Sequence, residues 1–208
     1  GQPFAPVMGL DDPVLEIKIT PNRADCLGIR GLARDLAATG VGRLKPRPPV
    51  TVPAAFASPI GVRFELPGDL AGACPLYAGR YIRGVRNGPS PAWLQKRLLA
   101  VGLRPISTLV DITNFFTLDT ARPLHVFDAD AVAGDIVVRM CGPGESLHAL
   151  NGKIYELDGE MTAIADGDGV VGLGGVIGGD STGCTADTVN VYVESALFDP
   201  IRTAATGR

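Results

Sequence analysis

Alternation of apolar and polar positions predicts several short strands along the chain. In residues 14–20, Leu15, Ile17 and Ile19 would share one face of a half-buried strand, with polar residues on the other. The dipeptide Asn151-Gly152 precedes another such run and is a signal for a hairpin. That run covers residues 153–157, and similar or β-branched runs predict strands at four further places: residues 60–66, 77–85, 136–139 and 189–193.

Two segments change to helical spacing. Residues 28–39 predict a helix because their apolar positions recur at intervals of three and four residues. Asp25 is a candidate cap near its start, and Gly40 is placed to end it. A second helix is expected to begin at Ser90-Pro91, with Ser90 as N-cap, and to end at Gly102. Helices in the first half and short strands in the second predict an α+β fold of mostly antiparallel or mixed strands.

A proline-rich stretch is the best candidate boundary in the chain. Residues 45–53 hold four prolines, which exclude a helix and favour an extended linker. The expected division is a strand–helix segment over residues 1–44, a linker over 45–59 and a main domain over 60–208, unless the whole packs as one unit. Because the chain lacks an initiator Met, we expect it to be cut from something longer.

Composition excludes some classes of protein. The net charge of −3 argues against a dedicated duplex-binding protein, whose affinity would depend on many basic residues. No apolar run reaches the length of a membrane span, so no membrane contact is expected. Four cysteines lie far apart without a CxxC pair, so we predict reduced thiols in a cytoplasmic protein and no metal site. They are Cys26, Cys74, Cys141 and Cys184.

The chain has two histidines, and one of them lies near other polar groups that could assist chemistry. His148 is expected to be an ordinary surface or hairpin residue, whereas His125 follows the segment Asp111-Ile112-Thr113-Asn114-Phe115. In one interpretation that segment supplies a cap, turn residues and core. In the other, Thr113 and Asn114 hold a water or a carbonyl oxygen while His125 orients or activates the water.

A glycine-rich segment and a carboxylate complete the candidate chemistry. Residues 172–180 contain five glycines, which form either tight turns or a close backbone approach to a ligand. The segment lacks the Gly-Lys-Ser/Thr ending of a Walker A loop and a following helix, so nucleotide binding is not expected. Glu194 follows a β-branched run and is either exposed at a strand end or directed into a pocket.

Several of these segments together resemble the bacterial phenylalanyl-tRNA synthetase β subunit. Each motif is weak alone, but their order and spacing fit the central editing region of that family over almost the whole chain. The matching segments are residues 17–31 (IKITPNRADCLGIRG), 110–114 (VDITN), 123–128 (PLHVFD), 175–179 (GVIGG) and 194–200 (ESALFDP).

The resemblance implies a fold, a set of site residues and an activity. It implies the tRNA-editing fold of this subunit. The implied activity is hydrolysis of the ester that joins a wrongly attached tyrosine to the phenylalanine tRNA. The resemblance assigns Glu194 to the tyrosine hydroxyl, Gly174 and Gly175 to the pocket wall, and Thr113, Asn114 and His125 to the ester and its water. No nucleophile motif adjoins His125, so water is expected to attack directly.

Departures from the family pattern and its other parts qualify this expectation. The family often has alanine at the position of Gly174, so the pocket floor here is expected to be slightly roomier. The family usually has alanine at the position of Val126, and this larger neighbour is expected to have little effect on His125. One family pocket residue is expected beyond Arg208, which would leave the site incomplete.

The resemblance also implies partners for the parent enzyme. They are the acceptor end of tRNA(Phe) and the α subunit of an α2β2 enzyme. ATP and Mg²⁺ would serve the parent enzyme, with no cofactor in this chain. Two alternatives stay open: a noncatalytic scaffold that contacts tRNA, and a freestanding relative of the editing domain.

Overall fold

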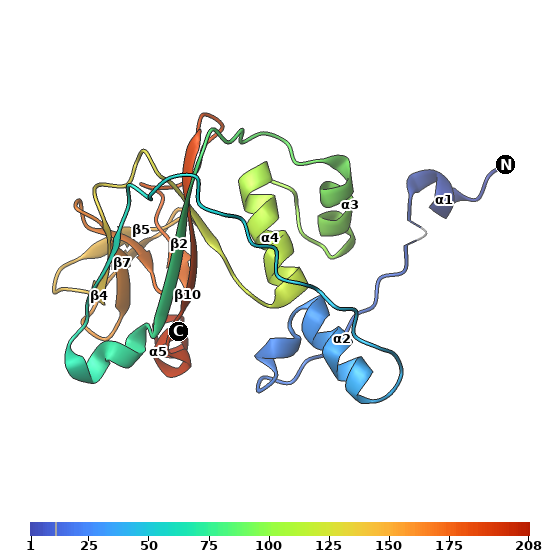
Figure 1. Ribbon diagram of the computed structural model, residues 1–208, viewed down its shortest axis with the longest axis horizontal. Coiled ribbons are helices and arrows are strands. Elements are labelled where there is room, and N and C mark those ends of the chain that lie inside the picture. The colour runs from blue at the N-terminus through green and yellow to red at the C-terminus, as the bar shows by residue number, and fades with distance from the viewer. Residues whose placement is uncertain (11) are drawn as a thin grey trace.

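A strand-rich part and a helical part lie side by side in the computed structural model, which describes residues 1–10 and 12–208 (Figure 1). The N-terminal segment extends away from both, whereas the C-terminal helix lies against the strands (Figure 1). The helices are α1 (Phe4–Met8), α2 (Ile29–Ala38), α3 (Ala92–Ala100), α4 (Thr108–Thr120) and α5 (Pro200–Thr206), with short 3₁₀ turns η1 (Ala24–Cys26) and η2 (Gly68–Ala73).

The strands form three sheets. A five-stranded sheet has the order β1-β4-β7-β8-β9, with β1 parallel to β4 and the other pairs antiparallel. A three-stranded antiparallel sheet has the order β2-β10-β3, and β5 and β6 form a hairpin. The strands are β1 (Val62–Glu65), β2 (Leu76–Arg83), β3 (His125–Asp128), β4 (Ile136–Met140), β5 (Ser146–His148), β6 (Ile154–Glu156), β7 (Thr162–Ala165), β8 (Val170–Leu173), β9 (Ile177–Gly178) and β10 (Asn190–Leu197).

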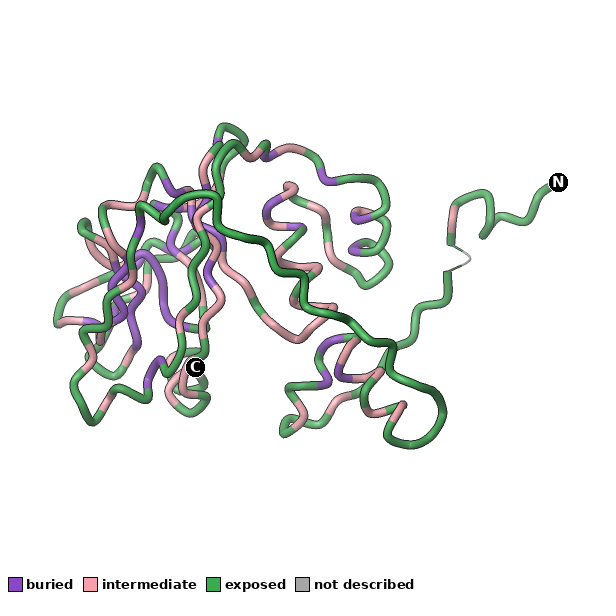
Figure 2. Tube along the Cα trace, in the orientation of Figure 1, coloured by how far each residue is buried: buried purple, intermediate pink, exposed green. Residues whose placement is uncertain are grey.

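The main core lies between the two larger sheets. Phe127 of β3 and Tyr192 of β10 are almost fully buried there, against Ile136 and Val138 of β4. Figure 2 shows the buried residues concentrated in these strands, while the N-terminal arm is exposed. The three-stranded sheet therefore has one face in this core, which is the face on which Phe127 and Tyr192 lie.

Helix α4 covers the opposite face of the three-stranded sheet. Leu109 of α4 packs against Val126 of β3 and Val191 of β10. Side chains alternate between faces along a strand, so Val126 faces α4 while its neighbours His125 and Phe127 face the core between the sheets. The helix and the glycine-rich segment thus lie on different sides of one sheet.

Most predicted elements are confirmed. The α+β class with mixed and antiparallel strands is as expected, as are the helix ending at Gly40 and the hairpin at Asn151-Gly152. The side chain of His148 is 66% exposed on that hairpin, as predicted. All four cysteines are free, and residues 45–53 contain neither helix nor strand.

The predicted strand over residues 14–20 is wrong. These residues pair with no strand in the described chain, and Leu15 is 79% exposed. An alternating pattern forms a strand only when a neighbouring strand supplies hydrogen bonds and covers its apolar face.

Both predicted helix caps are also wrong. Helix α2 begins after Gly28, while the carboxylate of Asp25 pairs with Arg23 instead. Pro91 precedes α3 in the cap position, and the hydroxyl of Ser90 donates to Asp111. Both side chains make hydrogen bonds with other side chains instead of capping a helix.

Helix α4 was not predicted from the pattern. One interpretation of its segment gave a cap and turn residues, yet 13 residues are helical and Asp111 is fully buried inside them. Asp111 accepts hydrogen bonds from the backbone N–H of Ile106 at 2.9 Å and from Ser90. This buried carboxylate fixes the start of α4 against the residues that precede α3.

Across the described residues, no helix combines the length and apolar character that crossing a membrane requires.

Candidate functional site

His125 and Glu194 face each other across two neighbouring strands. His125 is the first residue of β3 and is paired in register with Glu194 of β10. Directly opposite residues of antiparallel strands have Cβ atoms about 5 Å apart on the same face. The fold therefore brings together two ionisable groups that are far apart in sequence, on the side that faces the core between the sheets.

Glu194 has a buried carboxyl group that accepts a hydrogen bond from a tyrosine hydroxyl. It is 8% exposed, and the hydroxyl of Tyr77 on β2 donates to its Oε2 at 3.1 Å. Burial raises the pKa of Glu194 to about 7, although the hydrogen bond from Tyr77 opposes that rise. Burial and the carboxylate also raise the pKa of Tyr77, so its hydroxyl keeps its proton and acts as the donor.

His125 is half-buried, with its Nε2 shielded from solvent, and its ring is neutral near pH 7. Burial lowers the pKa of His125 to about 4, and its Nε2 makes no hydrogen bond with any described residue. Its ring packs edge-on against Phe127, with ring centroids 4.3 Å apart. A neutral imidazole with one free nitrogen can hold a water or a substrate oxygen by a hydrogen bond.

The glycine-rich segment packs directly on this pair. A Cβ added to Gly178 of β9 would lie 2.3 Å from Cε1 of His125. A Cβ on Gly174 would lie 2.6 Å from the ring of Phe198, and Gly175 has a positive φ of 72°. The backbone of this segment therefore lies close to the side chains of His125 and Phe198, and its approach to a ligand stays a prediction.

Thr113 and Asn114 lie on a different element from the His125–Glu194 pair. Both are half-buried on α4, and the hydroxyl of Thr113 donates to the backbone carbonyl of Val110 in the same helix at 2.8 Å. Among the described residues, no hydrogen bond joins either of them to His125 or Glu194. Their part in the site stays a prediction, as do the parts of Gly174 and Gly175.

Three contributors were missed by reasoning from the sequence. Tyr77 lies on the inner face of β2, Gly178 packs on the histidine ring, and Phe198 packs on Gly174. The spacing of Tyr77, Gly79 and Tyr81 in one predicted strand signalled a shared face. Nothing in the sequence indicated that Glu194 would lie beside it.

His125 and Glu194 can both form hydrogen bonds while carrying little charge. Between about pH 4 and pH 7, His125 is neutral and Glu194 is largely protonated, given the pKa values of about 4 and about 7. The nearby thiol of Cys74 is buried, and burial raises its pKa to about 11, so it is a poor nucleophile at neutral pH. The pair therefore presents hydrogen-bonding groups rather than a reactive nucleophile.

The comparisons with known proteins agree with this architecture. The family model described as "B3/4 domain" matches residues 73–208, which include the three-stranded sheet of His125 and Glu194 and every strand of the five-stranded sheet except β1. The chain belongs to the B3/4 domain family. The family recognised from the sequence, the bacterial phenylalanyl-tRNA synthetase β subunit, is therefore confirmed, with its central region as the matching part.

Curated relatives of this B3/4 chain share much of its sequence. It is 61% identical over 197 residues to the phenylalanine–tRNA ligase beta subunit of Paramagnetospirillum magneticum, covering 95% of the chain and 25% of that relative. It is 57% identical over 209 residues to the same subunit of Rhodospirillum rubrum, covering all of the chain and 26% of the relative. The chain thus spans about a quarter of the length of these relatives.

A solved structure shares the fold. An N-terminal fragment of the phenylalanyl-tRNA synthetase beta subunit from Pyrococcus horikoshii matches with a TM-score of 0.50 and 16% identity. The match covers 87% of this chain and 54% of that fragment. At this low identity the likeness concerns the fold alone.

Proposed function

We propose that the His125–Glu194 site hydrolyses the ester that joins a wrongly attached tyrosine to tRNA(Phe). Water attacks the ester carbonyl, the bond to the ribose oxygen breaks, and free tyrosine and the ribose hydroxyl are released. The reaction would act as a proofreading step for a phenylalanine–tRNA ligase, the enzyme named in the curated relatives.

The observation that carries this proposal is the hydrogen bond that Glu194 already accepts from the chain's own Tyr77. The hydroxyl of Tyr77 lies 3.1 Å from Oε2 of the buried carboxyl group, which is the contact that a tyrosine substrate would require. Glu194 has a second carboxyl oxygen, Oε1, that accepts no hydrogen bond from any described residue. A substrate hydroxyl could use Oε1 while Tyr77 holds Oε2.

Burial explains why such a site would discriminate tyrosine from phenylalanine. A phenylalanine ring placed against Glu194 would leave a polar group unpaired away from water, which costs roughly 1–3 kcal/mol. A site built to bind a hydroxyl can therefore reject the analogue that lacks it, whereas an apolar pocket cannot strongly reject an added hydroxyl. This asymmetry gives a reason for a second site beside a phenylalanine-specific synthetic site.

The proposed role of His125 follows from its pKa of about 4. An imidazole this weakly basic accepts a full proton poorly at neutral pH, so it would position the attacking water through Nε2. Thr113 and Asn114 are proposed to contact the ester, and Gly174 and Gly175 to line the pocket. These four assignments rest on the family resemblance.

The setting proposed for this reaction is the cytoplasm, within an enzyme of the α2β2 type. Its partners would be the α subunit and the acceptor end of tRNA(Phe). ATP and Mg²⁺ would serve amino-acid activation elsewhere in the enzyme, with no role for either proposed in this chain.

The test is the clearance of tyrosyl-tRNA(Phe) by this chain and by a full-length synthetase that carries its sequence. Both are compared with the His125→Ala variant and with His148→Ala, which removes the exposed histidine as a matched control. We expect His125→Ala to slow clearance at least tenfold and His148→Ala to leave it unchanged. Equal clearance by His125→Ala would leave a noncatalytic, tRNA-contacting role as the better account.

A further inference from the structure

A cavity of about 620 Å³ lies where the N-terminal helical segment meets the end of α4. Arg30 and Arg34 of α2 line one side, and Thr120 at the end of α4, with Ala121 and Arg122 after it, lines the other. Among the described residues, its lining includes three arginines and one acidic residue, Asp25. The sequence motif around Arg23–Gly31 thus contributes to a basic cavity, which the hydrolytic proposal leaves without a role.

The walls of this cavity are held by close backbone contacts. A Cβ added to Gly28 would lie 2.3 Å from the backbone nitrogen of Ala121, so α2 begins directly against the end of α4. Ala121 itself has a φ of 54°, a left-handed conformation that is strained for a residue with a side chain. A Cβ on Gly31 would lie 1.8 Å from the carbonyl oxygen of Asp25. These contacts fix the position of α2 against the end of α4.

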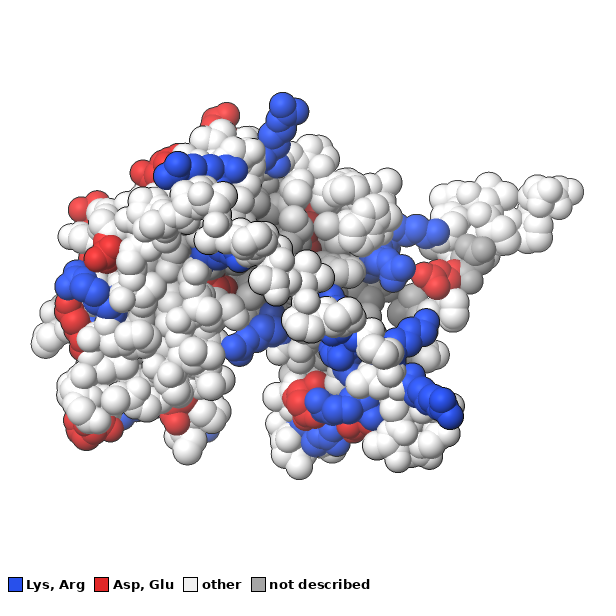
Figure 3. Space-filling view, viewed as in Figure 1, with Lys and Arg blue, Asp and Glu red and all other residues white. Residues whose placement is uncertain are grey.

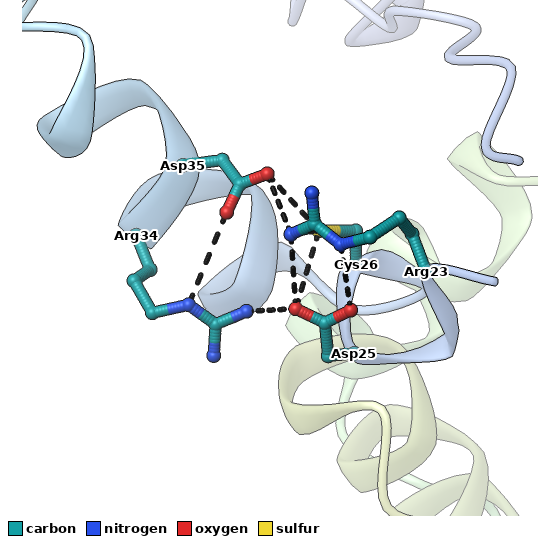
Figure 4. Close-up of polar contacts among 5 residues, drawn as sticks. All are labelled: Arg23, Asp25, Cys26, Arg34 and Asp35. Atoms are coloured by element: carbon teal, nitrogen blue, oxygen red, sulfur yellow. Dashed lines mark hydrogen bonds and ion pairs between the residues drawn. The ribbon is translucent and has the colours of Figure 1, made fainter.

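A cluster of paired charges forms one wall (Figure 4). The guanidinium of Arg23 donates to Asp35 at 2.7 Å and to Asp25 at 3.0 Å, and Arg34 also donates to Asp25. Arg23 also lies 2.9 Å from the sulfur of Cys26, so it occupies the position between Asp25, Cys26 and Asp35 where a cation would otherwise bind. Two arginines and two aspartates balance each other in this cluster.

The other two arginines of the cavity are not balanced by acidic groups. Arg30 makes no hydrogen bond or ion pair with any described residue, and Arg122 uses only Nε, which donates to Ser195 at 3.2 Å. The segment from Arg23 to Arg47 carries six basic and two acidic residues, in a chain whose net charge is −3. Figure 3 shows basic side chains gathered over this helical part. The surplus positive charge favours an anionic ligand.

The cavity is close to the proposed hydrolytic site along the chain. Arg122 lies three residues before His125, and its partner Ser195 directly follows Glu194 on β10. Ser195 and Glu194 point to opposite faces of the sheet, so the cavity and the site meet at one end of the same strands. A flexible anionic chain held by Arg122 could reach His125 around the edge strand β3.

We propose that Arg30 and Arg122 bind backbone phosphates of the RNA close to its esterified 3′ end. Guanidinium groups bind phosphate with two parallel hydrogen bonds, and Arg30 and Arg122 have terminal nitrogens free to do so. This inference rests on the proposed function for its choice of RNA as the anion. It adds a positioning site that would hold the RNA while the ester lies at His125.

The test is the binding of unacylated tRNA ending in CCA to a full-length synthetase that carries this sequence. Arg30→Ala, Arg122→Ala and the double variant are compared with Lys153→Ala, an exposed lysine on the β5–β6 hairpin. Affinity is measured by fluorescence anisotropy over a series of salt concentrations. Circular dichroism checks folding, and Arg30→Lys and Arg122→Lys keep the charge if an alanine variant is unstable.

We expect the double variant to bind about tenfold more weakly, with each alanine lowering the slope of log K against log salt by about 1. The lysine variants should keep most of the slope, and Lys153→Ala should match the unmodified enzyme. Unchanged affinity and slope in the double variant would overturn the inference, as would an equal loss in Lys153→Ala. Because unacylated RNA binding needs no hydrolysis, this result is independent of whether the ester is cleaved.

Discussion

The stability of the fold should depend on pH through His125 and Glu194 in opposite directions. Burial lowers the pKa of His125 from 6.5 to about 4 and raises that of Glu194 from 4.5 to about 7. The contribution of His125 to the free energy of unfolding is fully present above pH 6.5 and is lost as the pH falls toward 4. The contribution of Glu194 is fully present below pH 4.5 and is lost as the pH rises toward 7.

Each loss has a magnitude that follows from the difference between folded and unfolded pKa values. One unit of pKa corresponds to about 1.4 kcal/mol, so each group should change the free energy of unfolding by about 3 kcal/mol between pH 4 and pH 7. In the unmodified protein the two trends cancel over most of this range. Removing one of the two groups should therefore make the pH dependence caused by the other visible in the free energy of unfolding.

The assay is urea unfolding followed by circular dichroism at several values between pH 4 and pH 7. Glu194→Gln should lose about 3 kcal/mol relative to the unmodified protein as the pH falls from 7 to 4, and His125→Asn should lose about as much as the pH rises. Subtracting the unmodified protein removes the effect of other titrating groups. Glu156→Gln, an exposed change on β6, should run parallel to it.

Parallel curves for all the proteins would refute the reasoning. They would mean that His125 and Glu194 do not both prefer their neutral forms in the folded chain. The same slope sign in both variants would refute it as well, because burial must act oppositely on an acid and a base.

Two further substitutions test the packing and the phenol contact. Gly178→Ala should cost about 1–3 kcal/mol of stability and slow hydrolysis because its Cβ would collide with the ring of His125, whereas Gly68→Ala meets no atom within 4 Å; thermal melts and tyrosyl-tRNA clearance measure both effects. Tyr77→Phe removes the hydrogen bond that holds the pKa of Glu194 down, so that pKa should rise above 7 and the pH–rate profile should move to higher pH; an unmoved profile would contradict this coupling.

The sequence predicted elements whose stability is largely local. Helix α2 has its apolar face at helical spacing, and the Asn151-Gly152 hairpin has its turn chemistry, so both were found. The alternation of residues 14–20 was misleading because no partner strand pairs with it in the described chain. Helix α4 was missed because its Thr, Ile, Val and Asn residues are weak helix formers, and packing of Leu109 on the sheet outweighs that preference.

The site was predictable as a set of residues more than as a geometry. His125 and Glu194 were both singled out, but only strand register places them opposite each other, and register is a property of the assembled sheet. The position of Tyr77 on Glu194 follows from the same register through β2. Helical structure around Thr113 and Asn114 changes what those residues can reach, which the linear motif could not indicate.

The most direct test of the central claim is the ratio of hydrolysis rates for tyrosyl-tRNA(Phe) and phenylalanyl-tRNA(Phe). It is measured in a full-length synthetase with this sequence, with Glu194→Ala and with Glu156→Ala as an exposed control. If Glu194 reads the tyrosine hydroxyl, the ratio should fall by at least about 100-fold in Glu194→Ala and stay unchanged in Glu156→Ala. A ratio that survives the loss of Glu194 would contradict the account.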